Sequence, residues 1–91
     1  MKYRVVLSTS YKRDLKKVKK QGKNVTLLES VIKIIASGEQ LEAKYRDHAL
    51  RGNFSGCREC HITPDWLLVY RIDKGELELI LLHTKSHSDL F

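Results

Sequence analysis

The second half of the chain alternates short apolar segments with tight turns, and this pattern constrains the fold most. Three strand-like segments, 58–63, 66–72 and 77–84, are separated by Thr63-Pro64-Asp65-Trp66 and Asp73-Lys74-Gly75-Glu76. Proline suits the second position of a turn and glycine tolerates positive φ, so both links have the composition of hairpin turns. The spacing therefore predicts a three-stranded antiparallel meander.

The start of the chain predicts a strand followed by a helix. Residues 3–7 form a β-branched run, and Ser8 or Ser10 can cap a helix that continues to about Gln21. Its buried stripe is expected to hold Tyr11, Leu15 and Val18. Six basic residues occupy its other positions, where they can follow an RNA phosphate backbone or form a solvated face: Lys12, Arg13, Lys16, Lys17, Lys19 and Lys20.

A second, more apolar helix follows. Thr26 and Glu29 stand in capping-box spacing, and Gly38 supplies a C-terminal stop. Residues 38–56 are then a polar connection. The elements together predict an α+β domain in which one sheet, built from the N-terminal strand and the antiparallel meander, carries two N-terminal helices on one face.

Strand parity predicts what each face of the meander carries. Two-residue loops pair Ile62 with Leu67 and Ile72 with Leu77, and they set Trp66 opposite His83. One face is then apolar and expected under the helices, with Cys60, Ile62, Leu67, Val69, Ile80 and Leu82. The other is mixed and expected as a working surface for RNA or a partner protein, with Glu59, His61, Trp66, Leu68, Tyr70, Leu81 and His83.

Length and charge limit the possible functions. The 91 residues suit one domain spanning 1–91, and a net charge of +6 favours RNA, DNA or an acidic protein as partner. No apolar run approaches the roughly 20 residues of a membrane helix, and the start lacks a signal-like apolar region. We therefore expect a cytoplasmic protein without a membrane partner.

The two cysteines match a haem-attachment pattern, Cys57-Arg58-Glu59-Cys60-His61. Haem is not expected, because no export signal is present and Met1 is the only methionine available as a distal ligand. The segment is predicted as a strand, in which an odd separation sends the two thiols to opposite faces. This argues against a disulfide or a shared zinc, so we expect reduced thiols, no cofactor and no metal.

The histidines suggest metal-free RNA cleavage. That reaction needs a base for the 2′-hydroxyl, an acid for the departing 5′-oxygen, and positive charge near the phosphate. Histidine can serve as either acid or base at neutral pH, and a neighbouring carboxylate fixes its tautomer. A set of four residues can supply these roles, although scattered surface histidines are the simpler alternative: His48, His61, Asp65 and His87.

Two aromatic residues have alternative interpretations. Trp66 can stack on an RNA base or pack in the core beside a turn. Phe91 can dock on the sheet and hold His87 in place, or it can be a frayed end.

Four segments together make the chain resemble the YafQ branch of the RelE superfamily of bacterial toxins. They are Tyr45-Arg46-Asp47-His48-Ala49-Leu50-Arg51-Gly52, Arg58-Glu59-Cys60-His61-Ile62, Pro64-Asp65-Trp66-Leu67-Leu68-Val69-Tyr70 and Ser86-His87-Ser88-Asp89-Leu90-Phe91. The resemblance implies a small sheet with two N-terminal helices on one side. It also implies an mRNA endonuclease that cuts within the ribosomal A site without metal, and that a cognate antitoxin, expected to be acidic, silences. The ribosome with its 16S rRNA, and mRNA, are then further partners.

Carried over residue by residue, the resemblance implies roles for the histidine set. His87 becomes the general acid, and Asp65 with His61 or His48 the base side, while Trp66 and Phe91 match positions linked to activity or substrate placement.

The chain departs from its relatives at one place. Where they often carry Arg-Thr-Gly, it has His83-Thr84-Lys85, so a bidentate arginine clamp on the phosphate is missing. Lys85, Arg51 or a protonated His83 are the expected substitutes. This departure keeps open a non-catalytic RNA- or ribosome-binding module regulated by a protein partner. A metal-dependent nuclease is disfavoured, because neither H-x₃-H nor paired-carboxylate spacing occurs.

Overall fold

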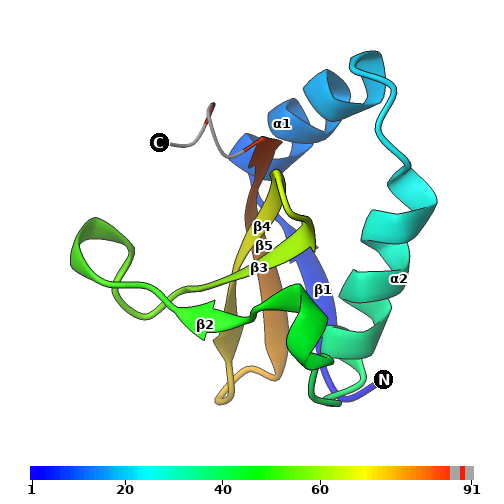
Figure 1. Ribbon diagram of the computed structural model, residues 1–91. Helices are drawn as coiled ribbons and strands as arrows, with labels where there is room; N and C mark the ends of the chain where they lie inside the picture. The colour runs from blue at the N-terminus through cyan, green and yellow to red at the C-terminus, as the bar shows by residue number, and fades with distance from the viewer. Residues whose placement is uncertain (87–88, 90–91) are drawn as a thin grey trace.

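One mixed sheet carries two helices on one face in the computed structural model, which describes residues 1–86 and 89 (Figure 1). In chain order the elements are β1 (Arg4–Leu7), α1 (Thr9–Lys20), α2 (Val25–Ala36), η1 (Ala43–Tyr45), β2 (His48–Ala49), η2 (Gly52–Phe54), β3 (Arg58–Thr63), β4 (Trp66–Asp73) and β5 (Glu78–Ser86), where η marks a short 3-10 helix. Within the described residues, no helix is long and apolar enough to cross a membrane.

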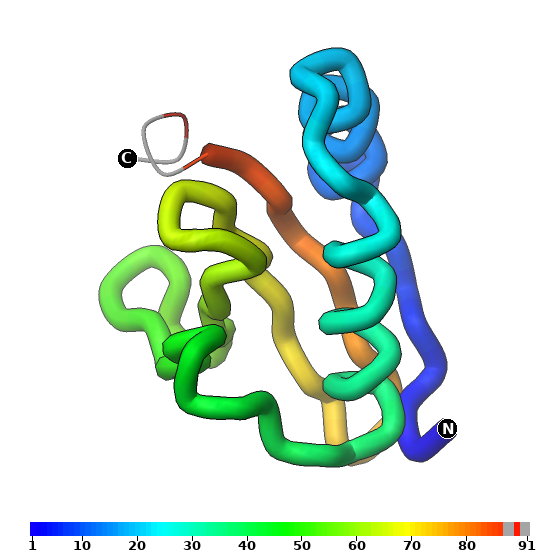
Figure 2. The backbone as a smooth tube through the Cα atoms, turned by 45° about the vertical axis from the view of Figure 1, so that its right-hand side comes forward, coloured from blue at the N-terminus to red at the C-terminus, as the bar shows by residue number. Residues whose placement is uncertain are grey.

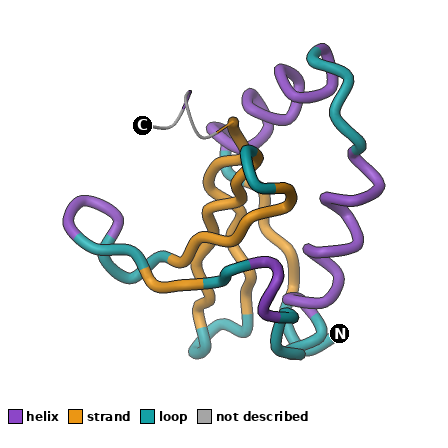
Figure 3. Tube along the Cα trace, viewed as in Figure 1, coloured by secondary structure: helices purple, strands orange, loops and turns teal. Residues whose placement is uncertain are grey.

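The strand order is β1-β5-β4-β3-β2. β1 runs parallel to β5, and the other pairs are antiparallel, so the predicted α+β fold and meander are confirmed. The short strand β2 was not predicted, because His48 and Ala49 lie in a stretch with the polar composition of a loop. Figure 3 shows the chain leaving the sheet after β2 as a loop with one short helical turn before it returns as β3.

Both helices begin at a capping side chain. The Ser8 hydroxyl oxygen accepts from the Tyr11 backbone N–H at 3.0 Å and also lies 3.3 Å from the Leu82 carbonyl oxygen, so the cap ties α1 to β5. Asn24 caps α2 by accepting from the Leu27 backbone N–H at 3.3 Å. The predicted capping box at Thr26 is therefore wrong by two residues, because an asparagine at position 24 already satisfies the first free N–H groups.

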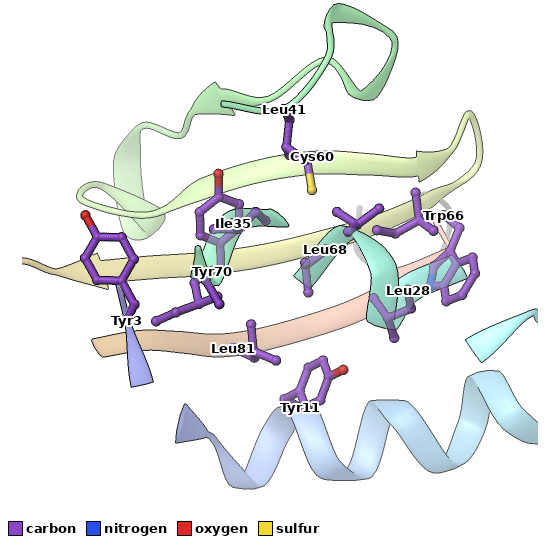
Figure 4. Close-up of a cluster of buried hydrophobic side chains, with 14 of the residues drawn as sticks. Tyr3, Tyr11, Leu28, Ile35, Leu41, Cys60, Trp66, Leu68, Tyr70 and Leu81 are labelled. Carbon is purple, nitrogen blue, oxygen red and sulfur yellow. The ribbon is translucent and has the colours of Figure 1, made fainter. Parts of the chain in front are cut away.

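The core lies between the helices and one face of the sheet (Figure 2, Figure 4). Trp66, Leu68 and Tyr70 of β4 pack there with residues of both helices. The Trp66 side chain is buried, and its indole N–H donates to the Thr84 hydroxyl at 2.8 Å. This bond satisfies the only polar atom of the indole, so Trp66 joins β4 to β5 from inside the core.

The register of the meander differs from the prediction at two places. Thr63 pairs with Trp66 as the two-residue turn requires, but an irregularity at Ile62 then pairs His61 with Leu67. The link between β4 and β5 is longer than predicted, with Asp73 opposite Glu78 and Leu77 rather than Gly75 at positive φ. A second irregularity lies between β4 and β5, where Tyr70 pairs with Leu81 but Val69 pairs with His83, so Leu82 is an extra residue on β5. Trp66 therefore lies opposite Ser86 and not His83.

The extra residue Ile62 reverses the predicted faces of β4, and the extra residue Leu82 reverses the faces of the β5 residues that follow it. Each one adds a residue to one strand of a pair, and a shift of one residue moves side chains to the opposite face. Cys60 and Ile62 lie under the helices as predicted, but the core cluster contains Trp66, Leu68 and Tyr70 of β4 with Leu79 and Leu81 of β5. Ile80 and Leu82, which were predicted under the helices, lie outside that cluster. Leu67 and Val69 are buried outside that cluster, so they belong to the other face.

Candidate active site

The face turned away from the helices, called here the outer face, carries polar side chains in two rows across the strands. Residues paired between neighbouring strands point to the same face. The first row runs across β2, β3, β4 and β5 and contains His48, Glu59, Val69 and His83. The second row runs across β3, β4 and β5 and contains His61, Leu67 and Lys85. Each row thus has an apolar centre with titratable or charged groups at both ends.

His48 and Glu59 form a close pair at one end of the first row. One carboxylate oxygen of Glu59 lies 3.4 Å from His48 Nε2, and the Glu59 side chain is only 6% exposed. His48 Nδ1 lies 2.8 Å from the Arg46 carbonyl oxygen, which can only accept, so the Nδ1 proton points there. The contact with Glu59 is an ion pair only when the His48 imidazole carries both ring protons. The pair therefore sets a carboxylate beside the imidazole nitrogen that does not face the Arg46 carbonyl.

The second carboxylate oxygen of Glu59 is buried and has no hydrogen-bond partner among the described residues. An unpartnered buried acceptor is costly, and such atoms concentrate at functional sites. The His61 ring lies beside this pair, with its centroid 6.3 Å from that of His48. His61 Nδ1 lies 3.3 Å from the Pro64 carbonyl oxygen, and this contact favours the tautomer with a free Nε2.

A buried carboxylate on α1 holds the opposite end of both rows. β1 ends at Leu7, opposite Leu81, and beyond it α1 lies against the edge of β5. Asp14 Oδ2 accepts from the Thr84 backbone N–H at 3.3 Å and lies 2.9 Å from His83 Nδ1. Its other oxygen lies 3.8 Å from the Lys85 ammonium nitrogen. Asp14 therefore contacts both His83 and Lys85, two of the residues predicted as substitutes for the arginine clamp.

Asp14, Glu59 and Phe54 were not predicted as site residues. Asp14 stands three residues after Tyr11 and four before Val18, so its place on the buried stripe of α1 was the available signal. Glu59 carried a weaker signal, as the strand neighbour of His61 on the same predicted face. Phe54 lies edge-on to the His83 ring at a centroid distance of 6.2 Å, and nothing in its local sequence indicated that contact.

A polar network fixes the chain next to His48. The Tyr70 hydroxyl donates to Asp47 Oδ1 at 2.5 Å, and Arg58 Nε donates to the same carboxylate at 3.3 Å. Burial, followed by the Asp47 hydrogen bond, raises the pKa of Tyr70 far above its ordinary value, so the phenol keeps its proton. Because Asp47 directly precedes His48, this network restricts the position of the imidazole.

The remaining predicted residues fall into three groups. Asp65 lies exposed in the turn between β3 and β4, and in the described residues no hydrogen bond or ion pair joins it to a histidine. Arg51 is exposed where η2 begins. The Trp66 indole is 2% exposed and offers no ring face for a base, so the core alternative agrees with the structure and the stacking alternative does not. His87 and Phe91 lie outside the described residues.

All six basic residues of the predicted α1 run are exposed, and Lys17 also lies 3.3 Å from Asp89. The stripe that α1 buries contains Tyr11, Asp14 and Val18, with Leu15 partly buried.

The thiols are both free. Cys60 lies in the core, where burial raises its pKa to about 12, so it is an inert thiol at neutral pH. Among the described residues, no three histidine, cysteine, aspartate or glutamate side chains form a group that could hold a metal ion.

Known proteins resemble this chain in sequence and in fold. The family model described as "Bacterial toxin of type II toxin-antitoxin system, YafQ" matches residues 3–91. The mRNA interferase toxin YafQ of Escherichia coli K12 is 32% identical over 85 residues, which cover 92% of this chain and 90% of that protein.

Solved structures add the fold. A metal-bound toxin from Helicobacter pylori is 42% identical with a TM-score of 0.91, and the match covers 100% of both chains. The E. coli DinJ–YafQ toxin–antitoxin complex contains a chain 29% identical with a TM-score of 0.87, covering 100% of this chain and 99% of that one. The resemblance indicated by the four sequence segments is confirmed: this chain belongs to the YafQ family of bacterial toxins of type II toxin–antitoxin systems.

Proposed function

We propose that this chain is an endoribonuclease toxin that cuts mRNA in the ribosomal A site, without a metal, by attack of a 2′-hydroxyl on the adjacent phosphate. The name of the E. coli relative, mRNA interferase toxin, supports the reaction class, and the DinJ–YafQ complex supports an antitoxin as partner. One observation carries the proposal most directly. The outer face carries the close pair His48 and Glu59, with His61 beside it, on β2 and β3, and it carries His83 and Lys85 on β5.

The base lies at the β3 end of the rows. Glu59, with His48 or His61, takes the proton of the 2′-hydroxyl, and the 2′-oxygen then attacks phosphorus. The contact between the Glu59 carboxylate and His48 Nε2 supports this role, because His48 is the exposed partner of the pair and can pass a proton to the buried carboxylate. Asp65, on the turn that follows His61, assists the same side of the reaction.

Positive charge comes from the β5 end. β3 and β5 are two strand spacings apart, so the Cα atoms of His61 and Lys85 are separated by roughly 10 Å across Leu67. A phosphate above Leu67 lies within reach of side chains from both strands. Lys85 and protonated His83 then stabilise the charge that develops on the phosphorane oxygens, with Arg51 as a further cation.

The acid completes the reaction. His87 donates a proton to the departing 5′-oxygen as the bond from phosphorus to that oxygen breaks, leaving a 2′,3′-cyclic phosphate and a 5′-hydroxyl. Phe91 serves to hold the tail that carries His87. Trp66 acts from within the core, because its bond to Thr84 fixes the strand segment between His83 and Lys85.

Mapping of cleavage on programmed ribosomes tests the proposal. Incubation of the purified protein with ribosomes that hold an mRNA should give new 5′ ends in the A-site codon by primer extension, and the ends should persist in EDTA. Induction of the protein alone should arrest bacterial growth, and an acidic antitoxin should reverse the arrest. Ribosome binding without new 5′ ends would instead indicate a binding module, and loss of cleavage in EDTA would contradict the metal-free reaction.

The exposed cations of α1 predict a salt-dependent interaction with ribosomal RNA. Reversing two of them, Lys12→Glu with Lys16→Glu, should weaken ribosome binding and lower the slope of log affinity against log salt by about 2. The fold should hold, because exposed lysines contribute little to stability. Lys33→Glu with Lys74→Glu makes the same change of charge at exposed positions elsewhere and is the matched control. Equal slopes in the two double variants would assign the α1 lysines to a solvated face.

A further inference from the structure

A pocket of about 420 Å³ opens beside His61 at the edge of the sheet. β2 pairs with β3 only at Arg58 and Glu59, so the rest of the β3 edge carries no strand. The pocket lies there, between η1, the β3–β4 turn and the start of α2. Its walls include Leu27, Lys44, Tyr45, Arg46, His61 and Pro64.

Tyr45 gives the pocket a flat, fixed aromatic wall. Its side chain is half-buried and packs against the hydrophobic core, so the ring is held in place from behind. The Lys44 ammonium nitrogen lies 5.2 Å from the ring centroid. Lys44 is itself largely exposed, so it can leave the ring for a phosphate when another planar group stacks there.

The charge of the pocket favours an anionic ligand. Lys44 and Arg46 line it, and the complete lining contains no aspartate or glutamate, while the exposed Glu42 carboxylate beside it lies 3.9 Å from the Lys44 ammonium nitrogen. Arg46 is exposed and occupies the left-handed region at φ 52°, which is unfavourable for a residue that is not glycine. Its carbonyl oxygen also contacts His48 Nδ1, so the strained residue connects the pocket to the first row.

We propose that this pocket binds a single nucleobase of the A-site codon, next to the scissile phosphate. An aromatic wall, two cations for the flanking phosphates and no carboxylate are what an unstacked nucleotide requires. His61 belongs both to the pocket and to the second row, so the base that enters must be adjacent to the phosphate above Leu67. The inference rests on the proposed function for the identity of the RNA.

Fluorescence on programmed ribosomes tests the pocket without requiring cleavage. The mRNA carries 2′-deoxynucleotides throughout the A-site codon and 2-aminopurine at one codon position at a time. Titration with the intact protein should change the fluorescence strongly at one position, because the base leaves its neighbours and stacks on Tyr45. Replacing that base by an abasic site should lower the affinity about 5- to 150-fold, the range for loss of one aromatic stack.

Three variants test whether Tyr45 and Arg46 contact the bound nucleotide. Tyr45→Leu keeps an apolar side chain against the core and should abolish both the position-specific signal and the sensitivity to the abasic site, whereas Tyr45→Phe should keep both. Arg46→Asn removes the cation at a left-handed position that asparagine tolerates, so it should lower ribosome affinity without loss of fold. Lys33→Asn on α2 removes one exposed charge elsewhere and should change neither the fluorescence signal nor the ribosome affinity.

The outcomes separate this inference from the proposed function. A position-specific signal that Tyr45→Leu removes, in a protein that cuts no unmodified mRNA, would support the pocket and contradict the nuclease. Cleavage by a parent protein that shows no position-specific signal, or a signal that Tyr45→Leu leaves intact, would overturn the pocket. The proposal would also be overturned if Tyr45→Leu lost antitoxin binding but kept the fluorescence signal and the sensitivity to the abasic site, because the pocket would then bind a peptide.

Discussion

Replacing Glu59 with glutamine should slow cleavage of ribosome-bound mRNA by about 100- to 10,000-fold, the usual contribution of a general base. Glutamine keeps the shape of the side chain but cannot take the proton of a 2′-hydroxyl. It also removes the negative charge that lies 3.4 Å from His48 Nε2. Ribosome affinity should change little, because a buried carboxylate contributes no attraction to the phosphate backbone.

Single-turnover cleavage and ribosome binding, measured on the same preparation, check this expectation. Glu76→Gln removes a carboxylate of the exposed β4–β5 turn and serves as the control for charge. A urea unfolding curve for Glu59→Gln distinguishes a loss of chemistry from a loss of fold. Cleavage by Glu59→Gln at the parent rate would assign Glu59 a structural role and leave His48, His61 and Asp65 as the candidates for the base.

Local signals predicted the elements well because the interactions that set them are local. Ser8 caps α1 through a bond to a residue three positions away, and Pro64 with Asp65 fixes a turn that pairs Thr63 with Trp66. Such interactions depend on a few neighbouring residues, which the sequence displays directly. The bounds of β3 and the existence of both helices were predictable for this reason.

The faces of the sheet were not predictable to the same degree, because they depend on where a strand carries an extra residue. Ile62 of β3 and Leu82 of β5 are the extra residues, and neither has a local mark that distinguishes it from a regular strand position. One such residue reverses the face of every side chain beyond it. The exposure of Trp66 was misjudged through this effect, whereas His61 and His83 still reached the same outer face.

The contact between His83 and Asp14 could not be predicted from local sequence, because the two residues are 69 positions apart in the chain. A parallel strand pair brings α1 to the unpaired part of β5, and only that topology places the carboxylate there. The two residues proposed to replace the missing arginine, His83 and Lys85, thus share one buried carboxylate at 2.9 and 3.8 Å. A lone lysine on an open strand would lack that restraint.

Replacing His87 with glutamine should slow cleavage by about 100- to 10,000-fold while ribosome affinity stays within a small factor. Glutamine keeps polarity and much of the bulk but cannot donate a proton as an imidazolium does. The position of His87 in the chain supports the role of acid. It comes directly after β5, whose Lys85 stands in the second row opposite Leu67 and whose Ser86 pairs with Trp66.

The acid and base roles predict different responses to the leaving group. An mRNA with a 5′-bridging sulfur at the scissile phosphate has a leaving group that needs no proton, so it should be cut by His87→Gln at close to the parent rate. Glu59→Gln should remain slow on the same substrate, because the 2′-hydroxyl still needs a base. Deletion of Phe91 should resemble His87→Gln on both substrates if Phe91 holds the tail. Equal impairment of His87→Gln on the sulfur and oxygen substrates would move the acid to another residue, with His83, fixed by Asp14 on the same face, as the next candidate.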